Sequence, residues 1–143
     1  MKGSMLFTYP KAVTVHHYPD AKACVARWEA LSAPCFREAV ARGLTECGRL
    51  GGKSWIVDLT GPDPGVPTQA DLAWISGEGM DVARDAGILA VINVHGKSAV
   101  ASMGAKRWSK MLTDGGISTY DCASVSDALQ LAVEIAAEKS ESE

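Results

Sequence analysis

The sequence predicts a single α/β domain with a mixed, mostly parallel sheet of about five strands, an N-terminal hairpin, and helices packed on the sheet. Two observations support this. Apolar runs alternate with helical patterns over residues 54–138, which is typical of parallel crossover units. The chain has 143 residues, of which 47% are hydrophobic and 22% charged, as expected for one globular domain.

Residues 5–18 are expected to form an antiparallel hairpin. Two strand-like runs, 6–9 and 12–18, are separated only by Pro10 and Lys11, and this connection is too short for a crossover. The hairpin therefore adds an antiparallel part to a sheet that is otherwise parallel.

A helical segment is predicted for residues 20–53. Cys24, Trp28 and Leu31 follow helical spacing, and a second helical pattern follows them. Pro34 cannot lie inside a straight helix, so we expect either two helices or one kinked helix.

The alternating strand–helix core spans residues 54–138. Its central strand is expected at Trp55–Leu59, flanked by a strand at Ile88–Val94, because both runs are apolar like strands covered on two faces. The tail of residues 139–143 has no apolar face and is expected to fray. Helical patterns cover 68–86, 98–112 and the residues from Val125 onward, and a short strand is expected at 118–122.

Charge and hydropathy argue against several classes of partner. The net charge of −3 provides no field that would attract nucleic acid or an anionic membrane. No apolar run approaches the ~20 residues that a membrane span needs. The N-terminus lacks the pattern of a signal peptide, so a cytoplasmic location is expected.

The cysteines and histidines do not predict a metal, cofactor or catalytic site. None of Cys24, Cys35, Cys47 and Cys122 belongs to a C-x-x-C pair or has a histidine at ligand spacing. We find no nucleophile–base pair and no cofactor motif, so the sequence predicts a protein that is not an enzyme and needs no cofactor or metal.

The tetrapeptide from His95 to Ser98 follows a strand and opens a helix, as a phosphate-binding loop does. Val91 occupies the place of that motif's first glycine, so the motif is not satisfied. Lys97 and Ser98 are kept as candidates for holding an anion at the helix start. The favoured alternative is that Ser98 caps the helix.

Asp58 and Thr68 flank the loop that follows the central strand, where sites form in α/β sheets. Asp58 is a candidate functional residue, and equally it could accept hydrogen bonds from that loop. Thr68 and Asp71 have capping-box spacing, with aspartate in place of glutamate, so Thr68 is expected to cap the helix.

Trp74 is predicted to be largely exposed, because a helical wheel sets it opposite Leu72 and Ile75. An exposed tryptophan is a common anchor in protein interfaces. The alternative is that the loop 62–67 or a second copy of the chain covers it.

The order of these elements resembles the anti-sigma factor antagonist domain, the STAS fold, over roughly residues 55–135. Trp28, Asp58, Trp74 and the pair Ala128-Leu129 are similar to the divergent bacterial branch called STAS-like. The resemblance is carried by the stretches Trp55–Thr60, Asp85–Ile92 and Tyr120–Leu129 and by the helix that opens at Thr68.

The resemblance implies a non-catalytic, regulatory protein-interaction domain. In signalling members, a partner kinase of the anti-sigma type phosphorylates a Ser or Thr at the helix start that Thr68 occupies here. The family's serine pair and following glycine are absent, and a proline-rich loop, 62–67, precedes the helix. The implied partner is such a kinase or a second copy of this chain. The implied contact residues are Asp58, Thr68, Asp71 and Trp74.

A small-molecule-binding module remains the alternative function. It would hold an apolar or anionic ligand between the segment 20–53 and the sheet edge. A pocket above ~300 Å³, lined by Trp28, Phe36 and polar groups, would favour this alternative.

Overall fold

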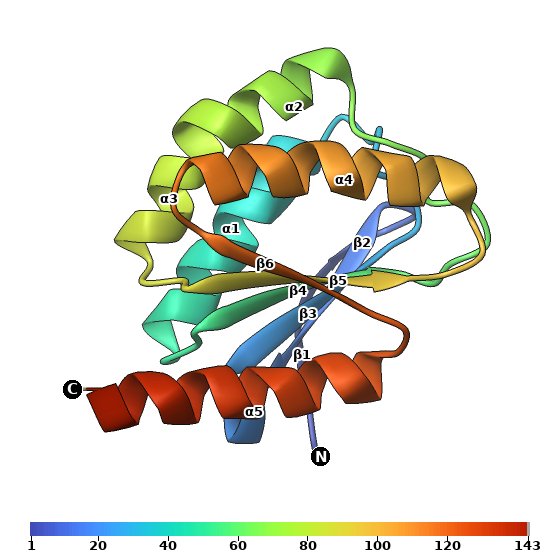
Figure 1. The fold of residues 1–143 in the computed structure, drawn as a ribbon. Coiled ribbons are helices and arrows are strands. Elements are labelled where there is room, and N and C mark those ends of the chain that lie inside the picture. Colours follow the sequence, from blue (N-terminus) through green and yellow to red (C-terminus); the bar gives the residue numbers. More distant parts are fainter. Residues whose placement is uncertain (143) are drawn as a thin grey trace.

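A computed structural model describes residues 1–142, and the side chains of residues 1–138. Within these residues, six strands form one mixed sheet, and helices cover both of its faces (Figure 1). The strands are β1 (Ser4–Tyr9), β2 (Val13–Tyr18), β3 (Ala23–Trp28), β4 (Ser54–Leu59), β5 (Ala90–His95) and β6 (Ser118–Cys122). The helices are α1 (Phe36–Arg49), α2 (Gln69–Trp74), α3 (Met80–Asp85), α4 (Ala99–Asp114) and α5 (Val125–Ser142).

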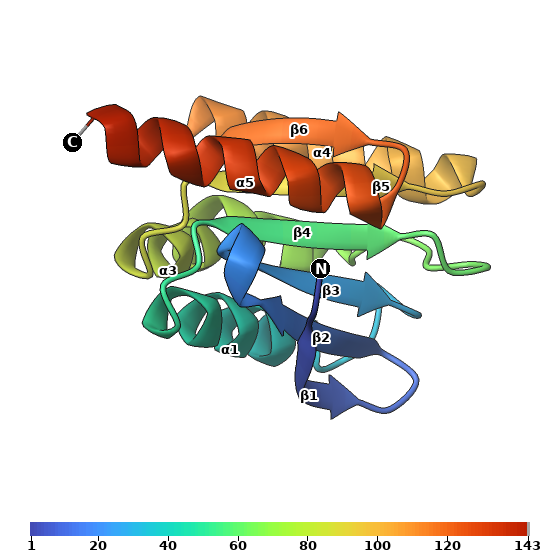
Figure 2. The same cartoon turned by 90° about the horizontal axis from the view of Figure 1, so that it is seen from below.

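The strands lie side by side in the order in which they occur along the chain (Figure 2). β1, β2 and β3 pair in antiparallel fashion, whereas β3 to β6 are parallel. The predicted mixed sheet and N-terminal hairpin are confirmed, with six strands instead of about five. β4 lies between β3 and β5, so the prediction of a central strand at Trp55–Leu59 flanked by the next apolar run is confirmed.

The prediction of a helical segment over residues 20–53 is wrong in its first part, because residues 23–28 form β3. This strand pairs with β2 on one side and β4 on the other, and both of its faces are covered. A strand buried on both faces is apolar at nearly every position, so some of its residues also match helical spacing. Only α1, which begins after Pro34, is a long helix in this segment.

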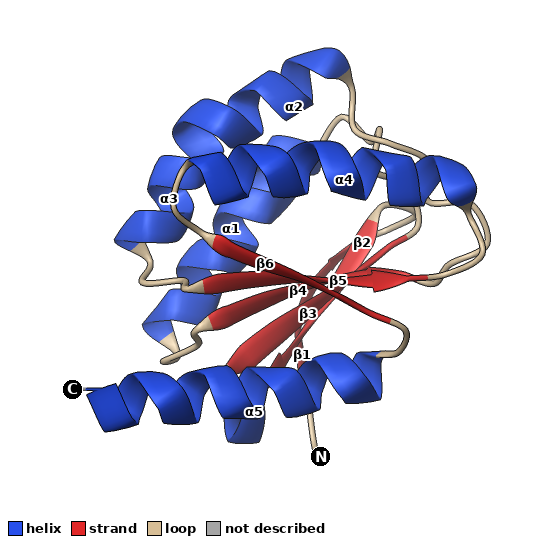
Figure 3. Cartoon of the chain, viewed as in Figure 1, coloured by secondary structure: helices blue, strands red, loops and turns tan. Residues whose placement is uncertain are grey.

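The two faces of the sheet are covered unequally. α1, α2, α3 and α4 lie on one face, whereas α5 and the short 3-10 helix Pro19–Ala21 lie on the other (Figure 3). We call these the multi-helix face and the α5 face. No helix within residues 1–142 is both long and apolar enough to cross a membrane. The backbone of α5 is helical as far as Ser142, and Glu143 lies outside the described residues. Whether residues 139–143 fray in solution stays a prediction.

The predicted helix over residues 68–86 contains a change of helical type. α2 and α3 are joined by a π-helical stretch, Ile75–Gly79, which we call the π segment. A wider π turn rotates the residues after it relative to those before it, so a single α-helical wheel does not describe this element.

Candidate functional site

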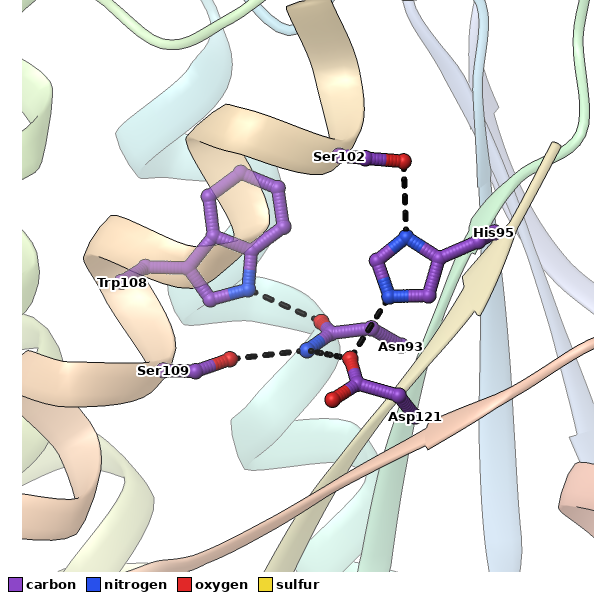
Figure 4. Close-up of polar contacts among 6 residues, drawn as sticks. All are labelled: Asn93, His95, Ser102, Trp108, Ser109 and Asp121. Atoms are coloured by element: carbon purple, nitrogen blue, oxygen red, sulfur yellow. Dashed lines mark hydrogen bonds and ion pairs between the residues drawn. The ribbon is translucent and has the colours of Figure 1, made fainter. Parts of the chain in front are cut away.

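A chain of polar side chains crosses from β5 to β6 and α4 on the multi-helix face (Figure 4). His95, the last residue of β5, lies between two partners. Its Nδ1 is 3.0 Å from the Ser102 hydroxyl, and its Nε2 is 2.6 Å from Oδ1 of Asp121. The His95 side chain is 25% exposed and that of Asp121 is 66% exposed, so solvent reaches the outer end of this polar network.

The inner end of the same network is closed to solvent. The Asn93 side chain is buried, and its Oδ1 accepts a hydrogen bond from the indole N–H of Trp108 at 2.9 Å. Its amide nitrogen donates to the Ser109 hydroxyl at 2.8 Å and to Asp121 Oδ1 at 3.4 Å. A buried amide is stable only when its polar atoms are paired in this way.

Strand register and helix periodicity together explain how these residues meet. Parallel pairing places Asn93 directly beside Asp121, and His95 follows two residues later on the same face of β5. Ser102 and Ser109 are seven residues apart on α4, about two helical turns, so both hydroxyls point toward β5.

The row of hydroxyl, imidazole and carboxylate has the order found in serine-dependent acyl transfer. The position of Ser102 differs from that template. Its backbone N–H donates to the carbonyl of Ser98 within the helix, at 3.1 Å, so it cannot stabilise an oxyanion on a substrate. The arrangement connects α4 to β5 and β6 through both nitrogens of His95.

The sequence motifs did not indicate this network, because His95 stood out only as part of a failed phosphate loop. A usable signal was present, because a histidine ends one strand and an aspartate lies near the end of the next. Parallel strands place their carboxyl ends at one edge, and this brings His95 and Asp121 within reach of each other.

The start of α2 agrees with its predicted capping. The Thr68 hydroxyl accepts a hydrogen bond from the backbone N–H of Asp71 at 3.1 Å, and Thr68 itself is exposed. The Asp71 carboxylate pairs with Arg37 of α1 at 2.8 Å. The ion pair ties the first turn of α2 to the first turn of α1.

The prediction that Trp74 is largely exposed is wrong, because the side chain is half-buried. Its ring meets Phe36 of α1 edge-on, with 6.4 Å between the ring centroids, and its indole N–H donates to Glu78 at 3.2 Å. The helical wheel failed because it describes one helix alone and does not include the packing of α1 against Trp74. Within the single chain, the covering group is α1.

Asp58 lies on the opposite face of the sheet from α2. Strand alternation places Val57 in the core of the multi-helix face, so Asp58 points toward the α5 side. Asp58 is 4% exposed, and its carboxylate accepts hydrogen bonds from the Thr60 backbone N–H at 2.9 Å and the Thr60 hydroxyl at 2.6 Å. Asp58 therefore has the alternative role considered for it, closing the loop after β4.

Other candidate residues are also accounted for. The Ser98 hydroxyl accepts from the N–H of Ala101 at 3.1 Å and caps α4, and Lys97 beside it is exposed. Among the described residues, no cluster of three or more His, Cys, Asp or Glu side chains could hold a metal ion.

Two of the cysteines lie close together in the core of the multi-helix face. Cys24 and Cys47 are both buried, and Cys47 lies 3.7 Å from the Ser54 carbonyl oxygen. A hydrogen bond with Cys47 and burial together raise the pKa of the Cys24 thiol far above its ordinary value. On the other face, burial raises the pKa of the Cys122 thiol, with a smaller contribution from Asp127.

Comparisons of this chain with protein-family models, with curated proteins and with solved structures found no match.

Proposed function

We propose that this chain is a non-catalytic, cytoplasmic protein-interaction domain of the STAS-like kind, and that its partner contacts the start of α2. One observation carries the proposal. The exposed hydroxyl of Thr68 caps α2 immediately after the loop that leaves the central strand. This is the position at which the STAS resemblance implies regulation. The partner is a second protein, either an anti-sigma-type kinase or another copy of this chain.

The local charges make Thr68 a suitable switch. A phosphate on its hydroxyl would add about −1.5 to −2 charges at neutral pH. The unpaired N–H groups of the first turn of α2 would favour that charge. Asp71 would oppose it only in part, because Arg37 already pairs with the Asp71 carboxylate at 2.8 Å. Phosphorylation would therefore make this surface strongly acidic while leaving the fold in place.

The non-catalytic part of the proposal is supported by the role of the His95 network. Both of its ring nitrogens have partners within the chain, and the N–H of Ser102 is used inside α4. A serine held in this way lacks the oxyanion donor that a nucleophile's own backbone supplies.

The proposal can be tested by capturing partners from a bacterial extract with the tagged full chain. Wild type, Thr68→Ala and Thr68→Glu are compared by quantitative mass spectrometry. We expect at least one partner to be retained by Thr68→Ala and lost from Thr68→Glu, because the glutamate imitates the added charge. Ser98→Glu is the matched control, since it adds a charge at the cap of another helix on the same face.

Two outcomes would contradict the proposal. If all variants are folded and retain every partner at the wild-type level, Thr68 is only a helix cap. If Ser98→Glu loses the same partners as Thr68→Glu, the effect comes from overall charge and not from the start of α2.

A further inference from the structure

An apolar cavity of about 60 Å³ lies between the sheet and the helices of the multi-helix face. All four tryptophans of the chain border it. Trp28, Trp55 and Trp108 are 2%, 4% and 4% exposed, whereas Trp74 is half-buried. Trp74 is therefore the aromatic wall that faces solvent.

Tryptophan rings that pack directly against glycines help to form the cavity. A Cβ atom at Gly43 of α1 would collide with the Trp55 ring, and one at Gly79 would lie 2.9 Å from the Trp74 ring. Phe36 stacks on Trp28 with 5.2 Å between the ring centroids, so large, stiff side chains surround the space. Such side chains collapse poorly into a gap, because close packing needs flexible or complementary shapes.

The outer wall of the cavity contains a change of helical type. It includes the π segment, whose Ile75 and Gly79 line the space. Gly77, in the middle of the segment, has open space where a Cβ would stand. The indole N–H of Trp74 is bonded to Glu78, within the same segment, so the ring and the segment can move together. Single π turns inside helices are frequent at functional sites.

We infer that this cavity binds a small, uncharged apolar molecule about the size of one aromatic ring. The molecule enters when Trp74 and the π segment move outward. The closed volume is well below the ~150 Å³ of an apolar protein cavity that holds benzene, so the wall has to move for a ring to fit. The side chains around the cavity are aliphatic or aromatic, and an anion would lose its hydration there without gaining a partner.

The test uses the full chain with benzene as the probe and benzoate as its charged counterpart. The indole N–H signals in a ¹H–¹⁵N NMR spectrum report on all four walls of the cavity. We expect benzene to shift the signals of Trp74 and Trp28 saturably and to raise the thermal unfolding midpoint, because a ligand of the folded state stabilises it. Benzoate should leave both unchanged.

Variants separate the cavity from nonspecific binding. Ala83 is buried and lines the cavity, so Ala83→Leu should fill it and weaken benzene binding at least about ten-fold. Ala73→Leu makes the same change at an exposed position of α2 and should bind benzene as wild type does. Trp74→Ala removes the outer wall, so benzene should bind and exchange faster than in wild type.

The inference is overturned if wild type shows no saturable shift with benzene, even where Trp74→Ala does, because the native space is then only a packing gap. It is also overturned if a folded Ala83→Leu binds benzene as well as wild type, or if benzoate produces the same shifts. Should Ala83→Leu fail to fold, wild type with benzene and benzoate still decides the question.

Discussion

The two faces of the same sheet are packed in different ways. The multi-helix face is filled by tryptophans and phenylalanines from many elements, and it keeps a cavity and a π segment. The α5 face is filled by small and aliphatic side chains under one helix, among them Ala23, Ile56, Ile92 and Ala132, each at most 1% exposed. Large, rigid rings leave gaps that small side chains do not. Binding and regulation are therefore expected on the multi-helix face, and the α5 face is expected to be mainly structural.

The largest expected effect comes from truncating a ring on the multi-helix face. Trp28→Ala should reduce the free energy of unfolding by about 3–5 kcal/mol, because it enlarges an existing cavity. Ile92→Ala, on the α5 face, should cost about 2–5 kcal/mol. Urea unfolding measures both. Saturating benzene should restore part of the loss for Trp28→Ala and none for Ile92→Ala, and equal recovery would contradict the contrast between the faces.

Enlarging a buried side chain should cost less stability on the multi-helix face than on the α5 face. Ala132→Leu forces three extra carbon atoms into a fully buried site under α5 and should cost about 1–3 kcal/mol. Ala83→Leu places the same atoms beside the cavity and should cost less than Ala132→Leu. Thermal unfolding of the two variants against wild type gives the comparison. If the two variants lose the same stability, the cavity in solution has no room for the larger side chain of Ala83→Leu.

The third prediction concerns alkaline pH. Unfolded thiols ionise near pH 8.5, whereas the raised pKa of Cys24 keeps its thiol protonated in the folded state. The unfolded state then binds fewer protons, so stability falls as the pH rises above this value, by at most about 1.4 kcal/mol per pH unit. Urea unfolding at pH 8, 9 and 10 should show a steeper fall for wild type than for Cys24→Ala. Parallel curves would contradict a raised pKa.

The smallest expected effect is the loss of a helix cap. Thr68→Ala and Ser124→Ala each remove a side chain that accepts a hydrogen bond from the third residue after it, at 3.1 Å. Each should lose about 1 kcal/mol of unfolding free energy. Hydrogen exchange should then report faster opening of α2 and the π segment in Thr68→Ala, while α5 in Ser124→Ala opens only at its first turn. If the π segment exchanges at the same rate in Thr68→Ala and in wild type, the Thr68 cap does not stabilise the outer wall of the cavity.

The parts of the fold predicted correctly are those with a long, unambiguous pattern. The apolar runs of β4 and β5 were followed by clear helix starts, and the structure confirms both strands. β3 was missed because five of its six residues are apolar and buried, and such a run fits a strand and a helix alike. The exposure of Trp74 was wrong because its cover comes from Phe36 of α1, a contact between elements that residue spacing within one helix does not indicate.

The candidate site was predictable only where it depends on local sequence. The cap at Thr68 follows from residues three apart, and the structure has it. The His95 network depends on the register between β5 and β6 and on the rotation of α4, and neither is encoded in short-range spacing. The cavity depends on side chains from all parts of the multi-helix face, so no local motif could have indicated it.

The strand order has a consequence for synthesis on the ribosome. Because each strand pairs with the one made just before it, the growing chain can add strands to the sheet in the order in which they emerge. α5 emerges after all six strands, and until then the face with Ile56 and Ile92 lacks the helix that covers it. A nascent chain that stalls before Val125 should therefore present an apolar sheet face to chaperones, whereas the face covered by α1 to α4 is already closed.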